Sequence, residues 1–460
     1  MRETKRQANL YSFYDHTGLE RHLERMAARG WLLCRISQFI WHYRRIEPKQ
    51  LTFCVCYYPR ATIYDPLPSV SQEEFYDFCA HTGWTLAASS GQLQVFYNER
   101  EDPTPIETDP ALEVDAIHRS AKKSFLRSHG LSAAALLLII GLFLFLLSRE
   151  PILTLANPSL LMSTLAFTLE LLNCAVEVST YFLWRRRALR AAERGEFLPT
   201  HSHVWFQWIL LAAALPLAVW WFALMAGNGM GGSAVVVLAG VTLMLAAVSG
   251  IRELLKKNYA SAETNRAVTM VAVVVLCYVF TVLIPRSMEG GRNSRFQTGA
   301  KDLPLALEDL LEGDFSHYSG YWQGIQSPLL GQYTAHEWPL GPTELFPEPV
   351  YLDYEVTLVK LPALYGWCWE TLLHQRDGWD SGDPEDVWYG YAYVPTDPAP
   401  WGAEEAYQWL PEDVADNEAD NNQYLLFYPD RAVTISLQWD QPPTRSQMAA
   451  VGEKLGRGAL

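Results

Sequence analysis

Five long apolar runs in the middle of the chain limit its possible folds more than any other feature. The first covers residues 129–148, about the length that an α-helix needs to cross a hydrocarbon core of about 30 Å. The other four cover residues 159–184, 204–226, 232–250 and 267–285. A soluble helix would carry a polar face along its whole length, and these runs do not. The sequence predicts a membrane protein with an all-α bundle of five transmembrane helices within residues 119–285.

The charges divide the chain into three parts. Residues 1–128 hold 16 Lys+Arg and 16 Asp+Glu, residues 129–285 hold 10 and 7, and residues 286–460 hold 10 and 28. Neither flank has the excess of basic residues that a nucleic-acid-binding face needs. We therefore expect the lipid bilayer as a partner, and no nucleic acid.

The basic residues near the runs predict the orientation of the chain. Lys and Arg are frequent before the first run and in the second and fourth loops: Arg119, Lys122, Lys123, Arg127, Arg185, Arg186, Arg187, Arg190, Arg194, Arg252, Lys256, Lys257 and Arg266. The first loop has only Arg149, and the third has none. Because Lys and Arg accumulate on the cytoplasmic side, the N-terminus is predicted to be cytoplasmic and the C-terminus extracytoplasmic. With four spans instead of five, the C-terminal side would change.

The region before the runs contains an internal repeat. Thr17 to Glu20 and Ser71 to Glu74 each have the sequence of a capping box at a helix start. Each predicted helix ends at a Gly-Trp pair that leads into β-like sequence, Gly30-Trp31 in the first copy and Gly83-Trp84 in the second. We interpret the glycines as helix caps and the tryptophans as core residues.

The order of these elements predicts the fold of the N-terminal domain. With an opening strand at Leu10 to Tyr14, the order is strand, helix, strands, helix, strands. This order is typical of a ferredoxin-like sandwich, in which helices cover one face of an antiparallel sheet. We therefore predict an α+β, ferredoxin-like cytoplasmic domain over residues 1–118.

The same segment resembles a bacterial family catalogued as domain of unknown function 2812, over roughly residues 8–120. The motif residues that carry the resemblance include Glu20, Met26, Gly30, Trp31, Gly83, Trp84 and Asp109. The resemblance implies a domain that precedes several membrane spans, a bacterial plasma membrane, and a PadR-like transcriptional regulator as a cytoplasmic partner. It implies no catalytic residue, and we interpret the motif residues as structural.

The acidic end of the chain is predicted to be a separate domain. Residues 286–300 have the composition of a tether, and residues 301–460 read as an extracytoplasmic α+β domain. Its predicted elements are strands at 354–360, 387–394, 423–428 and 432–439, helices at 303–311 and 363–374, and a final helix that is capped by Thr444 to Gln447. The acidic cluster from Asp380 to Asp386 lacks the ligand spacing of an EF-hand, so no metal site is predicted.

The second apolar run contains the polar residues of greatest interest. Glu170 and Glu177 are seven residues apart and share a helix face, with Asn173 between them. A carboxylate at mid-bilayer costs at least about 2.5 kcal/mol on insertion scales. Two interpretations stay open. The two acids are protonated groups that only hold the helices together, or they bind a cation, relay protons or sense the membrane.

The motifs of common enzyme classes are missing. The chain has no Walker loop, no Gly-x-Ser-x-Gly and no His-Glu-x-x-His, so we predict a non-enzymatic protein without catalytic residues or cofactors. The leading hypothesis is a multi-pass membrane sensor or regulatory protein that couples the extracytoplasmic domain to a cytoplasmic protein-interaction domain. The alternative is a small transporter or transporter subunit that uses Glu170 and Glu177. No oligomeric state follows from the sequence.

Overall fold

The computed structural model describes ten segments of the chain, and the predicted acidic cluster at 380–386 lies outside them. They are residues 3–9, 11–37, 40–200, 204–227, 231–292, 303–340, 349–374, 391–411, 422–439 and 441–457. The chain forms two compact units. The first comprises residues 1–141, 164–219 and 237–282, and the second comprises residues 142–163, 220–236 and 283–460. Each unit therefore joins one flanking domain to parts of the apolar region.

The N-terminal domain repeats one arrangement, strand–helix–strand–strand. The first copy consists of β1 (Thr4–Ala8), α1 (His16–Ala28), β2 (Trp31–Ile36) and β3 (Ile40–Arg45), and the second of β4 (Thr52–Tyr57), α2 (Val70–His81), β5 (Thr85–Ser90) and β6 (Leu93–Asn98). Each copy forms its own antiparallel sheet, in the orders β1-β3-β2 and β4-β6-β5. The repeat is confirmed. The described strands form two three-stranded sheets, whereas the predicted ferredoxin-like sandwich has one.

The starts of the helices differ from the prediction. The opening strand is Thr4–Ala8 rather than residues 10–14. Helix α1 is capped by Asp15, whose Oδ1 accepts a hydrogen bond from the Gly18 amide at 3.1 Å, and α2 begins after Ser69 without a side-chain cap. Both predicted capping boxes are therefore wrong, because other side chains, or none, take the free amides.

The glycine prediction is confirmed. Gly30 and Gly83 follow α1 and α2 with φ angles of +79° and +91°, in the left-handed region that favours glycine at the end of a helix. A Cβ atom on Gly30 would also lie 2.8 Å from the carbonyl oxygen of Ile46.

The core of the N-terminal domain extends beyond the predicted boundary at residue 118. Its buried side chains from α1 are Leu19, Leu23, Met26 and Ala27. Helix α3 (Pro110–Lys123) adds three more, and α4 (Phe125–Arg149) adds Phe125. The long helix α6 (Pro158–Ala192) adds Tyr181, Trp184 and Ala188. The end of α6 is thus part of the domain core.

Five helices in the described part of the chain are long and apolar enough to cross a membrane. They are α4, α6, α7 (Val204–Gly227), α8 (Gly231–Lys257) and α9 (Ala262–Arg292), and each contains one of the predicted runs. Large apolar side chains project from them, such as Leu138 (75% exposed) and Leu243 (72% exposed). The helical part of α9 includes residues 286–292, so the predicted tether does not begin at residue 286.

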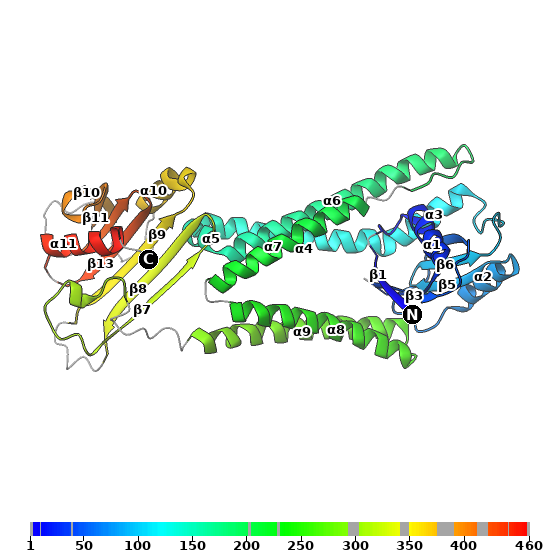
Figure 1. Cartoon of the computed structure of the whole chain (residues 1–460), viewed down its shortest axis with the longest axis horizontal. Helices are drawn as coiled ribbons and strands as arrows, with labels where there is room; N and C mark the ends of the chain where they lie inside the picture. Colours follow the sequence, from blue (N-terminus) through cyan, green and yellow to red (C-terminus); the bar gives the residue numbers. More distant parts are fainter. Residues whose placement is uncertain are drawn as a thin grey trace, which may run out of the picture. The chain divides into compact units, whose positions relative to one another are not determined.

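The C-terminal domain is built on one antiparallel sheet of seven strands (Figure 1). The strands are β7 (Tyr318–Gln326), β8 (Leu330–Pro339), β9 (Tyr351–Val359), β10 (Tyr391–Thr396), β11 (Glu405–Pro411), β12 (Gln423–Tyr428) and β13 (Arg431–Gln438). Their order is β10-β11-β12-β13-β9-β8-β7. Strand β12 and the β12–β13 hairpin agree with the sequence prediction, whereas β7, β8 and β11 were not predicted.

Alternating side chains of this sheet build two cores, one on each face. On one face, Leu426 and Val433 pack with residues 303–310 and with α11 (Arg445–Val451), whose predicted capping box is confirmed. On the other face, Leu425 and Phe427 pack with α10 (Tyr365–Leu373) and with the short helix α5 (Pro151–Ala156). Because α5 connects α4 to α6, a piece of the apolar region belongs to the C-terminal core.

Candidate functional site

Glu177 of α6 connects the N-terminal domain to two long helices. Its Oε1 accepts hydrogen bonds from Ser12 Oγ and from Gln207 Nε2 of α7, each at 2.9 Å. The Glu177 side chain is buried, with 6% of the residue exposed, and its Oε2 has no hydrogen-bond partner among the described residues. A buried carboxylate with one unpaired oxygen is costly unless hydrogen bonds to its other oxygen hold it in place. The site therefore depends on the fit between the domain and α6.

The neighbouring polar residues of α6 have different environments. Asn173 Oδ1 accepts a hydrogen bond from the same Gln207 Nε2 at 2.9 Å, which extends the network along α6. Glu170 is exposed, and its nearest polar contacts are Asn173 and Cys174 of its own helix. The sequence placed Glu170 and Glu177 in one group, whereas the structure brings only Glu177 and Asn173 into a network with α7.

Aromatic side chains surround this contact. Tyr14 donates a hydrogen bond to Thr180 Oγ1 at 3.0 Å, and its ring lies 5.3 Å from that of Tyr181. The Tyr181 hydroxyl lies 2.8 Å from His118 Nδ1 of α3, and Tyr181 is fully buried. Residues 177–188 of α6 thus contact the domain through both hydrogen bonds and apolar packing. No sequence pattern predicted that this segment packs against the domain.

The loop after α6 makes a second contact with the N-terminal domain. The hydroxyl of Thr200 donates to Asp15 Oδ1 at 2.6 Å, and Thr17 and Thr200 exchange two hydrogen bonds between backbone amides and hydroxyls. Asp15 and Thr200 are both 1% exposed. Because Asp15 also caps α1, the start of α1 is tied to the loop between α6 and α7.

The motif residue Glu20 lies at a cavity of about 330 Å³ in the N-terminal domain. Its Oε1 accepts a hydrogen bond from the Val55 amide at 2.9 Å, and β4 is an edge strand of its sheet. Glu20 therefore pairs an edge amide that would otherwise be free. In the same cavity, His16 Nε2 lies 3.1 Å from Glu113 Oε1 of α3.

Burial and charge shift the pKa values of these groups. Burial raises the pKa of Glu20 to about 7, against smaller opposing effects of His16 and of the Val55 hydrogen bond. Burial lowers the pKa of His16, but its hydrogen bond to Glu113 and the charges of Glu113 and Glu20 outweigh this and raise the pKa overall. The cavity thus contains one carboxyl group, that of Glu20, that changes protonation state near neutral pH.

The other motif residues have structural positions. Met26 is buried in the core, and Asp109 caps α3 by accepting the Ala111 amide at 2.8 Å. Trp84 is 3% exposed and donates to the Thr104 carbonyl oxygen, as predicted for a core residue. Trp31 is only half-buried, with the Arg45 guanidinium 5.0 Å from its ring centre. The prediction that Trp31 is a core residue is confirmed only in part, because the ring packs against the core but stays partly exposed beside the Arg45 guanidinium.

The described residues hold no group of three or more His, Cys, Asp or Glu that is arranged to bind a metal ion. The chemistry that the geometry does offer is a hydrogen-bonded, partly unpaired carboxylate where a domain meets two long helices. Its hydrogen bonds join the domain to α6 and α7.

Comparison with known proteins identifies the N-terminal domain. Residues 16–128 match the model of the family described as "Protein of unknown function (DUF2812)", which agrees with the resemblance seen in the motif residues. No curated protein and no solved structure matched the chain. The matched segment includes Glu20, His16 and Glu113, and it ends just inside α4.

Proposed function

We propose that this protein is a multi-pass membrane sensor or regulator that transmits a change in its C-terminal domain to its N-terminal domain. The observation that carries the proposal is the continuity of the chain between two cores. Helix α5 is part of the C-terminal core, and α6 begins two residues later and ends inside the N-terminal core. Because only Asn157 separates the two helices, a displacement of α5 would also move the start of α6.

Membrane insertion is supported by the exposed apolar surface of the five long helices. Leucines on α4, α7 and α8 that are more than half exposed would be costly in water, at about 1.5–3 kcal/mol for each large apolar side chain, and favourable in lipid. A membrane thus supplies the environment that this surface requires.

The internal contacts of each unit also support an odd number of spans. The N-terminal domain contacts Thr200, after the second long helix, and Asn265, after the fourth. The C-terminal domain contacts α5, after the first long helix, through the hydrogen bond from Ser327 Oγ to the Leu155 carbonyl oxygen at 2.7 Å. In this proposal the chain crosses the membrane five times, so these two sets of loops lie on opposite sides, and the distribution of Lys and Arg favours a cytoplasmic N-terminal side.

Reporter fusions test the orientation. We expect a C-terminal alkaline phosphatase fusion to be active and a C-terminal green fluorescent protein fusion to be dark, since the C-terminus is extracytoplasmic in this proposal. Bright C-terminal fluorescence would contradict the five-span arrangement.

Hydrogen exchange tests the transmission. In the full-length protein in lipid nanodiscs, Ile152→Ala loosens α5 from the C-terminal sheet, because Ile152 is 6% exposed in that core. We expect amide exchange to accelerate at least about threefold in residues 11–17 and 177–184, since sites that share a coupled element shift together. The matched control is Leu361→Ala, at an exposed position of the same domain. Faster exchange in α5 with no change in residues 11–17 would contradict the proposal.

The transporter alternative makes a different prediction. Its pathway would use Glu170, which is exposed on α6, and Gln at this position keeps the size of the side chain while removing its charge. Proton flux through proteoliposomes that is lost in Glu170→Gln would favour the transporter. A PadR-like regulator as the cytoplasmic partner rests on the family resemblance, and a pull-down of the full chain with mass spectrometry tests it.

A further inference from the structure

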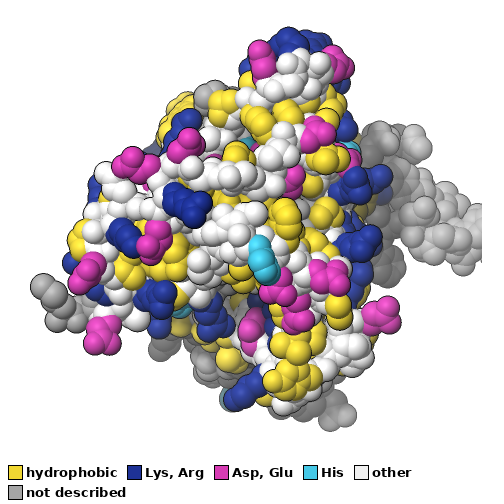
Figure 2. Space-filling view, turned by 90° about the vertical axis from the view of Figure 1, so that its right-hand side faces the viewer, with side chains coloured by type: hydrophobic (Ala, Val, Ile, Leu, Met, Phe, Trp, Pro, Cys, Tyr) yellow, Lys and Arg dark blue, Asp and Glu magenta, His cyan; other side chains and the backbone are white. Residues whose placement is uncertain are grey.

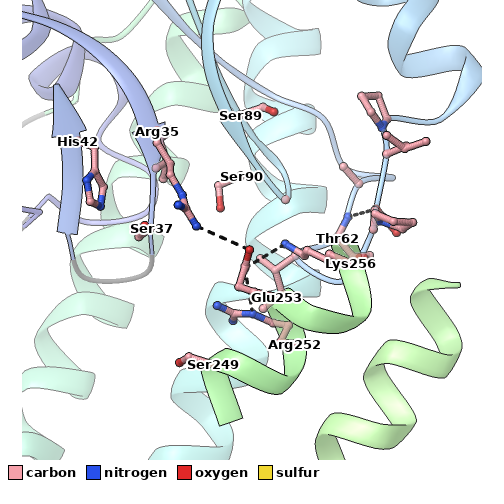
Figure 3. A pocket seen from close by; sticks show the side chains of 18 of the residues that line it. Arg35, Ser37, His42, Thr62, Ser89, Ser90, Ser249, Arg252, Glu253 and Lys256 are labelled. Carbon is pink, nitrogen blue, oxygen red and sulfur yellow. Dashed lines mark hydrogen bonds and ion pairs between the residues drawn. The ribbon is translucent and has the colours of Figure 1, made fainter. Parts of the chain in front are cut away.

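A cavity of about 820 Å³ in the first unit is lined by residues from both the N-terminal domain and α8. The N-terminal domain contributes Arg6, Arg35 and the serines of the β5–β6 hairpin. The last turns of α8 contribute Ser249, Arg252, Glu253 and Lys256 (Figure 3). The volume is within the range of about 300–1,000 Å³ that is usual for small-molecule sites.

Cations dominate the charge of this cavity. Four basic side chains line it (Arg6, Arg35, Arg252 and Lys256) against two carboxylates (Asp65 and Glu253). Glu253 lies between three of the cations, at 3.7 Å from Arg35, 3.8 Å from Arg252 and 3.7 Å from Lys256 (Figure 3). Asp65 is engaged within its own turn, where it accepts the Thr62 amide at 2.5 Å. Of the two carboxylates that line the cavity, Glu253 is the one with described ion pairs to these three cations.

Two of these cations are partly removed from water. The Arg252 side chain is 18% exposed, and its Nε has no hydrogen-bond partner among the described residues. The Lys256 side chain is 26% exposed. A desolvated cation without a full set of partners favours an anion. On the face of the molecule in Figure 2, by contrast, positive and negative side chains are interspersed.

The walls of the cavity add hydroxyl donors and apolar surface. Ser90 and Arg35 project into the same space from β5 and β2 (Figure 3). Ile40, Ile63 and Leu67 line the cavity and are each more than 40% exposed. Cations and hydroxyls beside exposed apolar side chains match a phosphate group that carries an apolar or ring substituent.

The position of the cavity is held by hydrogen bonds. Asn265 of α9 is fully buried, and its Nδ2 lies 3.1 Å from the Tyr64 carbonyl oxygen and 3.3 Å from that of Arg252. The loop that forms one wall is thus fixed to the end of α8, just beyond the apolar part of that helix. A lipid headgroup and a soluble phosphate compound can both reach this place.

We propose that this cavity binds a phosphate-bearing anion between Arg35, Arg252 and Lys256, and that Glu253 occupies the place of the anion when none is bound. The inference is independent of the proposed sensor function, because it concerns binding at the first unit and not transmission from the second.

The experiment uses opposite changes of charge in the full-length protein. The first measurement is the binding of inorganic phosphate to the protein in detergent. The second is the binding of phosphatidylglycerol to the protein in nanodiscs, with nanodiscs of phosphatidylcholine alone as the reference. We expect Arg35→Gln to weaken binding about tenfold, the loss typical of one charge-assisted contact. We expect Glu253→Gln to strengthen it severalfold, since the competing carboxylate is gone. The matched control is Arg119→Gln on α3, an exposed arginine that pairs with Asp115 outside the cavity.

The two probes distinguish the sources of the phosphate. Binding of phosphate with this variant pattern assigns a soluble ligand, and the same pattern only with phosphatidylglycerol assigns a lipid headgroup. Either result supports the site. Binding of neither probe, or binding that Arg35→Gln and Glu253→Gln leave unchanged, would overturn it. Because Glu253→Gln is expected to increase affinity, loss of folding cannot imitate the predicted pattern.

Discussion

The N-terminal and C-terminal domains each take part of the apolar region into their cores, but with different chemistry. The N-terminal domain holds α6 through hydrogen bonds that involve Ser12, Tyr14 and Glu177, as well as through buried rings. The C-terminal domain holds α5 mainly by apolar packing, with one hydrogen bond from Ser327. Apolar packing depends on complementary shape, whereas each hydrogen bond also depends on the distance and angle between two particular groups. The proposed transmission from the C-terminal to the N-terminal domain would use this difference between the two contacts.

The largest expected effect is at the N-terminal contact. Tyr181→Ala removes a fully buried ring that the domain core shares with α6. We expect the free energy of unfolding of the N-terminal domain to fall by about 3–5 kcal/mol, measured by urea unfolding of the full chain in detergent. Phe182→Ala, at an exposed neighbour on α6, is the control. Equal effects of the two substitutions would show that α6 is not part of this core.

The corresponding change at the C-terminal contact is smaller. Ile152→Ala leaves a cavity between α5 and the sheet, and we expect a loss of about 2–4 kcal/mol in the unfolding of the C-terminal domain. The loss should be independent of pH around neutrality, because burial raises the pKa of Cys368 in this core to about 11 and raises that of Tyr365 above its usual value. A strong pH dependence of this loss would contradict the apolar description of the contact.

The raised pKa of Glu20 should make the stability of the folded protein depend on pH. We expect no such dependence at the C-terminal contact. The pKa of Glu20 is raised to about 7 in the folded protein, so the folded state binds more protons than the unfolded state between about pH 4.5 and 7. Stability should therefore fall as the pH rises through this window. Glu20→Gln should remove about 1–3 kcal/mol of that fall, seen as a flatter plot of melting temperature against pH. An unchanged slope would mean that Glu20 does not titrate there.

The two motif tryptophans should differ in how much each contributes to the stability of the N-terminal domain. Trp31→Ala loses a partly buried ring and a cation–π contact, and we expect a cost of about 2–3 kcal/mol. Trp84→Ala, in the buried position of the second repeat, should cost more, at about 3–5 kcal/mol. The melting temperatures of the two variants give the comparison directly, and equal losses would show that both rings have the same burial.

The spacing of apolar residues and the capping signals predicted much of this fold. They did not predict the contacts between residues that are far apart in the sequence. The apolar stripe of α1 and the positive φ of Gly30 and Gly83 follow from local rules. The same local rules failed at Glu20, because a carboxylate three residues after a hydroxyl has the sequence of a capping box whether it bonds its own helix or an edge strand. Local apolar character also does not fix burial: Phe78 of α2 is 58% exposed, whereas Cys79 beside it is buried.

The candidate site was predicted only in part. An acidic residue in an apolar run is visible in a sequence, so Glu177 and Asn173 were found. Their partners Ser12 and Gln207 lie 165 and 30 residues away from Glu177 and are ordinary polar residues. No pattern within a single helix indicates which of two acids, Glu170 or Glu177, meets the domain. That choice depends on where the domain packs against α6.

A double-mutant cycle tests most directly whether Glu177 joins the N-terminal domain to α6. Ser12→Ala and Glu177→Ala are made singly and together in the full chain, with unfolding followed by urea titration in detergent. Since the two side chains share a hydrogen bond at 2.9 Å, we predict an interaction free energy of about 1 kcal/mol. The control cycle pairs Ser12→Ala with Glu170→Ala, which has no described contact with Ser12, and should be additive within about 0.5 kcal/mol. Additive effects of Ser12→Ala and Glu177→Ala would contradict the account, because they would show that the domain does not contact α6 at this carboxylate.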